Sequence, residues 1–175
     1  MLMQQEEVKK ALERFRRHVV SQAKRNLTNK QKNSSKKLYN SIEGELHVHK
    51  NSFTLEFSME DYGVFQDAGV SGKNKKYNTP YSYKSKMPPP RAFEEWVKRK
   101  GLKGRNNKGQ FIKTKTLTFL IARSIYKKGI KPSLFFTKPF EAAYKNLPEE
   151  LVEKYGLDAI QLFNEQIDEI LKQNG

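Results

Sequence analysis

The sequence predicts an α+β protein: a long N-terminal helix packed on a small antiparallel β-sheet, with further helices and an added C-terminal helical tail. Three observations predict it. Apolar residues recur every three or four positions over residues 5–27, two alternating segments lie within residues 45–59, and helical patterns return after residue 115. The chain of 175 residues favours one domain, placed at residues 1–147, with an acidic helical extension at residues 148–175.

The first helix is predicted over residues 5–27. Steps of three and four place its apolar residues in one stripe of about six helical turns. The stripe contains Val8, Leu12, Phe15, Val19, Ala23 and Leu27. A helix with one apolar stripe must dock on another element. Residues 28–37 are polar and show no periodicity, which predicts a connector.

A β-hairpin is predicted next, from two segments that alternate between apolar and polar residues. The segments are residues 45–49 and 53–59, and Lys50, Asn51 and Ser52 form the predicted turn. One face would carry Leu46, Val48, Phe53, Leu55 and Phe57. Because an isolated hairpin is unstable in water, we expect the first helix to cover this face.

The middle of the chain is predicted to consist of short elements and long loops. Residues 61–72 begin as a compact apolar segment and end with turn-forming residues. A proline-led short helix over residues 92–97 should stop at Gly101. Residues 103–115 are consistent with another hairpin, with its turn at residues 107–109.

Three more helices are predicted after residue 115. Thr116 is the expected N-cap of a helix that ends at Lys128, and Gly129 follows that end. One side of this helix would carry Leu117, Leu120, Ile121, Ser124 and Ile125. After a turn, helices are expected over residues 137–146 and 148–171, the last interrupted by Gly156.

The positive charge of the chain is concentrated in its middle third. The formal net charge is +15, and residues 61–131 alone carry 18 basic and 4 acidic side chains, whereas residues 132–175 carry a net charge of −4. Such asymmetry suggests a polyanionic partner for the middle segment. The candidate nucleic-acid-facing residues are Lys73, Lys75, Lys76, Tyr77, Lys84, Lys86, Arg105 and Lys108, with Tyr81 and Tyr83 also available for stacking. A solvated set of loops is the alternative.

Composition excludes several classes of protein. The chain has no cysteine, so disulfides, zinc ribbons, iron–sulfur clusters and cysteine nucleophiles are excluded, and a reducing cytosol fits. No apolar run approaches the ~18 residues needed to span a bilayer, and the first residues do not resemble a signal peptide. We therefore expect a soluble intracellular protein, or one that leaves its cell by a route that needs no leader, and in either case no membrane partner.

Residues that could carry chemistry are few. His47 and His49 share one face of a predicted strand, but no third metal ligand lies nearby and a solvent-facing pair is the simpler interpretation. The spacing from Gly104 to Gly109 resembles a phosphate loop but lacks the Lys and Ser or Thr that must follow. The carboxylates Glu56, Glu60, Asp61 and Asp67 do not form a local nuclease-like motif. We expect no catalytic residue, no metal and no cofactor, with a metal-dependent nuclease as a third alternative.

Aromatic residues gather at the predicted turn before residue 137. Phe135, Phe136 and Phe140 lie within six positions of one another. Such a cluster is most often part of a core. If part of it is exposed, it would instead be a subunit contact.

Two degenerate motifs stand out along the chain. The first motif contains Tyr62, Gly63, Phe65, Asp67, Gly69 and Gly72. Arg91 and Phe93 follow, and the second motif contains Ile121, Ala122, Arg123, Ile125, Gly129, Ile130, Pro132, Phe135 and Phe136. In these motifs and in the order of its elements, the sequence resembles the neck and tail-completion (head–tail joining, minor tail) proteins of tailed bacteriophages. The resemblance covers roughly residues 5–145. The chain departs from the pattern by a basic insertion at about residues 69–90 and by the acidic tail.

The resemblance implies a non-enzymatic structural virion protein that assembles as a ring between portal and tail, around the path of the DNA. Its implied partners are further copies of itself, a portal or adaptor protein, tail or other neck proteins, and nearby viral DNA. It would be made in the bacterial host cytoplasm and end at the head–tail junction of the virion. Candidate subunit contacts are Tyr62, Phe65, Asp67, Gly69, Gly72, Phe135 and Phe136. The alternative is a non-virion, sequence-independent nucleic-acid-binding protein that uses the basic loops and their tyrosines.

Overall fold

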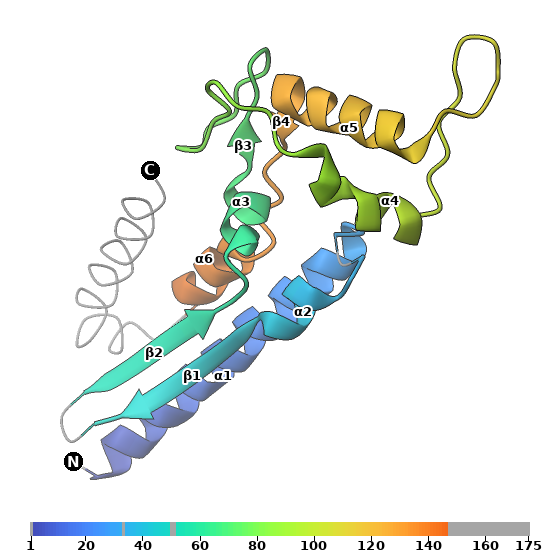
Figure 1. Cartoon of the computed structure of the whole chain (residues 1–175). Coiled ribbons are helices and arrows are strands. Elements are labelled where there is room, and N and C mark those ends of the chain that lie inside the picture. The colour runs from blue at the N-terminus through green and yellow to red at the C-terminus, as the bar shows by residue number, and fades with distance from the viewer. Residues whose placement is uncertain (1, 33, 50–51, 147–175) are drawn as a thin grey trace. The chain divides into compact units, whose positions relative to one another are not determined.

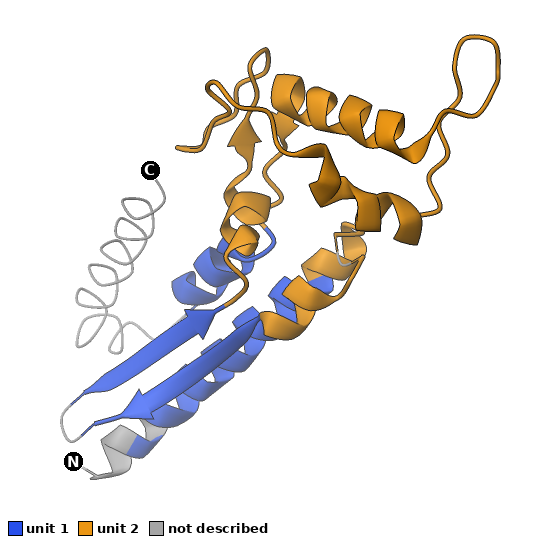
Figure 2. Ribbon diagram, viewed as in Figure 1, with its two compact units in different colours: residues 1–25, 42–58, 135–175 blue, residues 26–41, 59–134 orange. Residues whose placement is uncertain are grey.

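The structure, a computed structural model, confirms the α+β fold class and describes residues 2–32, 34–49 and 52–146 (Figure 1). The chain divides into two compact units (Figure 2). Unit 1 comprises residues 1–25, 42–58 and 135–175, and unit 2 comprises residues 26–41 and 59–134. Each unit combines segments that are far apart in the sequence, so no linker in the sequence marks the division.

Unit 1 is built on the long helix α1 (Leu2–Asn29), which belongs to this unit as far as Arg25. The predicted stripe is confirmed, because Phe15, Val19 and Ala23 are buried on α1. Strands β1 (Glu43–Val48) and β2 (Phe53–Ser58) pair antiparallel, with Leu46 opposite Leu55 and Val48 opposite Phe53. Helix α6 (Thr137–Lys145) completes the unit within the described residues.

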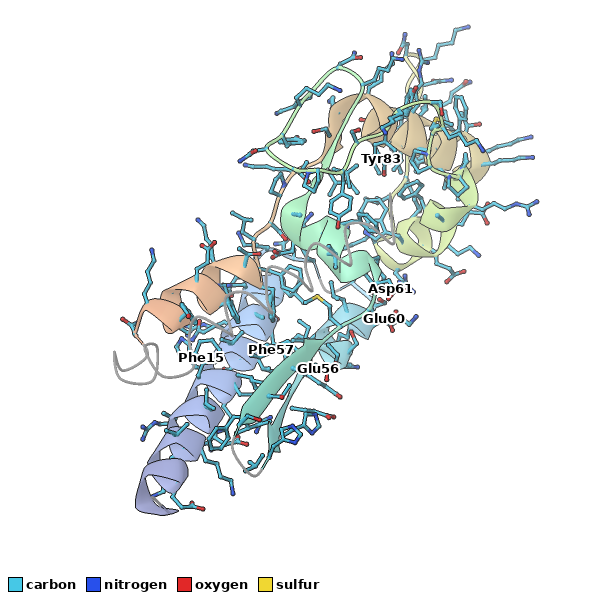
Figure 3. All side chains as sticks on the ribbon, turned by 90° about the vertical axis from the view of Figure 1, so that its left-hand side faces the viewer. Phe15, Glu56, Phe57, Glu60, Asp61 and Tyr83 are labelled. Carbon is cyan, nitrogen blue, oxygen red and sulfur yellow. The ribbon has the colours of Figure 1, made fainter. Side chains whose placement is uncertain are left out.

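A cluster of aromatic rings forms the core of unit 1. The Phe15 and Phe57 rings lie 6.3 Å apart, edge to face, and Figure 3 shows them projecting toward each other from α1 and β2. Phe140 of α6 lies 5.4 Å from Phe15, and Phe136 lies 5.4 Å from Phe57. Phe135 is fully buried as well. The aromatic run before α6 is therefore part of the core, which is the first of the two interpretations that the sequence allows; the other is a subunit contact.

A polar contact also ties α1 to the hairpin. The Arg16 guanidinium donates a hydrogen bond of 2.8 Å to the Gly44 carbonyl and is ion-paired with Glu13 at 2.7 Å. The expectation that the first helix covers the hairpin is thus confirmed. Cover is incomplete at the far end, where Val48 is 53% exposed. The predicted turn at residues 50–52 lies partly outside the described residues, although the His49 N–H donates to the Ser52 carbonyl at 2.9 Å.

After the last residues of α1, unit 2 contains two short helices. Helix α2 (Lys37–Ser41) follows residues for which the sequence predicts only a connector, and its Leu38 is buried. Helix α3 (Tyr62–Ala68) packs closely beside it. A Cβ atom at Gly63 would lie 2.8 Å from Leu38 Cδ1 and 2.7 Å from Met59 Sδ. A glycine in α3 therefore allows this close contact.

The predicted turn over residues 69–72 is in fact an inner strand, which corrects the sequence interpretation. Strand β3 (Val70–Ser71) pairs antiparallel with β4 (Gly129–Ile130), and Ser71 also bridges Ser82 on the other side. The Ser71 N–H donates to the Tyr81 carbonyl at 2.8 Å, and the Tyr83 N–H donates to the Ser71 carbonyl at 2.9 Å. Partners far away in the sequence stabilise this strand, and no local pattern reveals them.

Helix α5 (Thr114–Lys128) packs against the short helices η1 (Pro90–Phe93) and α4 (Glu94–Arg99). It begins two residues before the predicted N-cap, with Lys113 as N-cap. Its buried positions are the small residues Thr118 and Ala122, whereas Leu120 is 45% exposed. The predicted apolar side is thus partly wrong, because small side chains let the neighbouring helix approach.

The ends of α4 and α5 agree more closely with the predictions from the sequence. Gly101 (φ +60°) follows α4, and Gly129 (φ +74°) ends α5 with its N–H bonded to the Ile125 carbonyl. Residues 104–112 form the expected hairpin-like loop, in which Arg105 bridges Phe111. The helix predicted over residues 148–171 lies outside the described residues. None of the described helices is long and apolar enough to cross a membrane.

Candidate nucleic-acid interface

The division into units separates the charge of the chain. Unit 2 carries 22 basic and 5 acidic side chains, a net charge of +17, so the remaining residues of the chain carry −2. A field of one sign attracts polyanions and speeds their association. Unit 2 is therefore the part of the molecule in which to look for a nucleic-acid interface.

The C-terminal end of α5 is joined to the basic loop that follows β3. The N–H groups of Lys73 and Asn74 donate hydrogen bonds of 2.9 Å to the Tyr126 and Lys127 carbonyls of α5. The last carbonyls of a helix lack partners within the helix, and these two bonds satisfy two of them. The loop is thus fixed to the helix end by its backbone, which leaves its side chains free to point outward.

This junction brings six lysines to one end of α5. All six are exposed, and we call them the lysine cluster: Lys73, Lys75, Lys76, Lys84, Lys127 and Lys128. Lys84 belongs to it because its carbonyl accepts a hydrogen bond of 3.3 Å from the Tyr126 hydroxyl. Lys127 and Lys128 are missing from the candidates chosen by sequence. The sequence holds one sign of their role: Gly129 ends their helix, and Lys127 and Lys128 therefore lie beside any segment that packs against that helix end. The negative end of the helix dipole stabilises such cations, and this alone could account for part of the cluster.

The tyrosines of the basic loop have mainly structural roles. Tyr81 packs edge to face on Phe65 at 4.7 Å, and Tyr83 packs on Tyr126 at 6.2 Å. Burial raises the pKa of both phenols. Tyr77 is half-buried, and the Lys75 ammonium lies 5.4 Å from the centre of its ring. Two of the three tyrosines predicted to stack therefore have structural roles, and a cation already lies over the ring of the third, Tyr77.

Two of the remaining basic candidates lie apart from the lysine cluster. Arg105 and Lys108 are exposed in the loop before α5, at the opposite end of this helix from the lysine cluster (Figure 1). A helix of 15 residues separates the two ends by about 22 Å. Lys86 is exposed two residues beyond Lys84. The structure thus divides one predicted patch into two groups at the ends of one rigid element.

Most of the candidate subunit contacts are interior residues. Asp67, Gly69, Gly72, Phe135 and Phe136 are buried, which argues against them as direct contacts with a neighbour. Gly69 and Gly72 instead allow backbone segments to pack closely. Tyr62 is 40% exposed and Phe65 is half-buried, so only these two offer surface.

The described residues contain no group of three or more potential metal ligands. His47 and His49 are exposed, and His47 lies 3.5 Å from Glu45. Glu60 is ion-paired with Lys37 at 3.0 Å. The segment from Gly104 to Gly109 folds as part of the loop before α5 and not as a phosphate loop between strand and helix.

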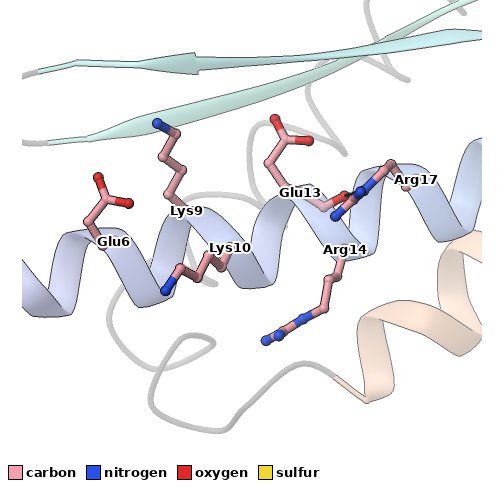
Figure 4. Close-up of a pocket in the computed structure, with 6 residues that line it drawn as sticks. All are labelled: Glu6, Lys9, Lys10, Glu13, Arg14 and Arg17. Atoms are coloured by element: carbon pink, nitrogen blue, oxygen red, sulfur yellow. Dashed lines mark hydrogen bonds between the residues drawn. The ribbon is translucent and has the colours of Figure 1, made fainter.

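A shallow depression on α1 lies outside unit 2. It is lined by Glu6, Lys9, Lys10, Glu13, Arg14 and Arg17, all from one helix (Figure 4). Arg17 Nε donates to the Glu13 carbonyl at 3.3 Å. Charges of both signs on one open helix face do not enclose a ligand.

No protein-family model, curated protein or solved structure matches this chain.

Proposed function

We propose that this protein is a structural subunit of a tailed-bacteriophage head–tail connector, acting in the neck or in tail completion. It assembles as a ring between portal and tail around the DNA path, and contacts a portal or adaptor protein and other neck or tail proteins. It works without catalysis or cofactor. It is made in the host cytoplasm and resides at the head–tail junction of the virion.

One observation carries the proposal: the two motifs that resemble this family pack on each other. Within unit 2, a Cβ atom at Gly69 would lie 2.6 Å from the Pro132 nitrogen and 2.7 Å from the Ile130 carbonyl oxygen. The N–H groups of Ser133 and Leu134 both donate to the Asp67 carbonyl at 3.0 Å. Residues of both motifs thus belong to one packed arrangement, as is expected when the two motifs form one structural feature of a family.

The charge of unit 2 supports the part of the proposal that concerns DNA. A net charge of +17 suits a surface beside a polyanion, and backbone contacts without base readout let DNA of any sequence pass. Of the candidate ring contacts, Tyr62 remains on the surface of unit 2. It is the residue we assign first to contact with the next subunit.

The same charge favours the second candidate function, a non-virion protein that binds nucleic acid without sequence preference. Electron microscopy of lysates distinguishes the two. Infection by a phage that lacks the gene should leave filled heads and separate tails, and the wild-type chain supplied in trans should restore joined particles. Normal joined particles without the chain would refute the connector proposal and favour the second candidate.

A further inference from the structure

The loop before α5 is a second basic loop of unit 2, outside the lysine cluster, and hydrogen bonds within it fix its shape. Its backbone closes through the bonds Asn106 N–H to Gln110 carbonyl, 2.9 Å, and Ile112 N–H to Gly104 carbonyl, 3.0 Å. The Asn106 side-chain oxygen accepts further bonds of 3.0 Å from the N–H groups of Lys108 and Gln110. A Cβ atom at Gly104 would lie 2.8 Å from Ile112 Cδ1. These contacts fix the conformation of residues 104–112, which we call the 104–112 loop.

An exposed aromatic ring organises one cation of this loop and one of the residue that precedes it. Phe111 is 61% exposed, more than any other large apolar side chain in the described parts of the chain. The Arg105 guanidinium lies 4.4 Å from the centre of its ring, and the Lys103 ammonium lies 5.7 Å from it. Arg105 is held from a second side by a bond of 3.3 Å to the Gly109 carbonyl. The ring thus reduces the freedom that two long side chains would otherwise lose on binding an anion.

We propose that the 104–112 loop binds the phosphate backbone of double-stranded DNA, with Phe111 as the platform that positions Arg105 and Lys103. Lys108 at the tip supplies a further cation. A phosphate ligand fits better than an unpaired base, because cations already lie over the ring on which a base would stack. The sequence from residue 96 to residue 140 contains no acidic side chain that would oppose an anion.

The position of the loop favours a duplex. It lies about 22 Å from the lysine cluster along α5, a distance that corresponds to about six base pairs at ~3.4 Å each. A stiff duplex can span two fixed points on a rigid helix without bending. This inference rests on the DNA contact of the proposed function. It does not depend on where in the virion the protein lies, so the DNA site and the connector function can fail separately.

The test measures binding of the full-length protein to a fluorescent 20-base-pair duplex of arbitrary sequence, as a function of salt. Arg105→Gln/Lys108→Gln should weaken binding about tenfold and reduce the salt slope by about two, because each phosphate contact contributes about one. Lys9→Gln/Arg14→Gln removes the same charge from the exposed face of α1 and is the matched control (Figure 4). It should change affinity less than twofold.

A second pair of variants separates the platform from the charge. Phe111→Ala keeps every cation and should weaken binding about two- to fivefold, whereas Phe111→Tyr should bind like the wild type. Equal affinity of Phe111→Ala and wild type would overturn the platform. Equal losses in Arg105→Gln/Lys108→Gln and its control would show a general field and overturn the site. If the loop variants lose binding to a synthetic peptide of residues 148–171 but keep DNA binding, the partner is an acidic protein segment and the proposal is wrong.

Discussion

Replacing three glycines of unit 2 by alanine separates two physical reasons for glycine. A Cβ atom added at Gly101 (φ +60°) would have no other atom within 4 Å, so Gly101→Ala tests backbone strain alone. Gly72 lies against the backbone of Lys127 and Gly129 without requiring a positive φ, so Gly72→Ala tests close packing alone. Gly69 (φ +78°) combines the strained φ with contacts of 2.6–2.7 Å to Pro132 and Ile130.

The expected magnitudes follow from these environments. Gly101→Ala should lower the free energy of unfolding by about 1–2 kcal/mol, from the left-handed backbone conformation. Gly72→Ala should lower it by about 1–3 kcal/mol, since the backbone at the end of α5 and the start of β4 must shift. Gly69→Ala should lose about 2–5 kcal/mol, because both effects act. Typical stabilities are about 5–15 kcal/mol, so Gly69→Ala can unfold unit 2.

The assay is urea unfolding followed by tryptophan fluorescence. The one tryptophan of the chain, Trp96, lies in α4, so its signal reports unit 2. The free energy of unfolding comes from the midpoint and slope of the transition. If Gly72→Ala is as stable as wild type, or Gly69→Ala loses no more than Gly101→Ala, the packing of β3 against β4 and residue 132 is refuted.

Three further perturbations test other parts of the structure. Phe15→Ala should lower the stability of unit 1 by about 3–5 kcal/mol, since it removes a buried ring from the aromatic core, and circular dichroism measures this loss. Unit 2 should lose stability as the pH rises above about 10, and Tyr81→Phe should reduce this loss, measured by Trp96 fluorescence. Replacing Lys73, Lys75 and Lys76 by Gln should reduce the salt slope of duplex binding by up to about three, measured by fluorescence anisotropy.

The reasons behind these expectations also name the results that contradict them. Burial raises the pKa of the Tyr81 phenol, so the folded state holds its proton more tightly. The contribution of the protonated Tyr81 phenol to the stability of unit 2 is complete below the ordinary tyrosine pKa. It is lost as the pH rises through the raised pKa of the folded state. A wild-type alkaline profile in Tyr81→Phe contradicts this. Unchanged stability in Phe15→Ala contradicts the aromatic core, and an unchanged salt slope in the triple variant removes the lysine cluster from the interface.

The N-terminal half of unit 1 could be predicted from the sequence because its signals are local. The stripe with Phe15 and Val19 has the period of a helix, and the alternation around Leu46 and Leu55 has the period of a strand. Strand β3 could not be predicted, because two residues carry no periodicity and their partners lie at residues 82 and 129–130. In α5, the buried positions are Thr118 and Ala122, where tight packing and not hydrophobicity selects the residue.

The candidate interface could be predicted in composition but not in layout. The lysine-rich loop is evident in the sequence, yet its junction with the end of α5 depends on two backbone bonds, from Lys73 to Tyr126 and from Asn74 to Lys127. Arg105 belongs to the same basic stretch of sequence as this loop, but in the structure the length of α5 separates the two. Phe111 gave no signal, because a single exposed aromatic residue has no pattern in the sequence.

The most direct test of the central claim is the location of this chain in purified virions. Quantitative mass spectrometry should find it in a fixed copy number per particle, and immunogold labelling should place it at the junction of head and tail. Its absence from particles, or a copy number that varies between preparations, would contradict the connector function.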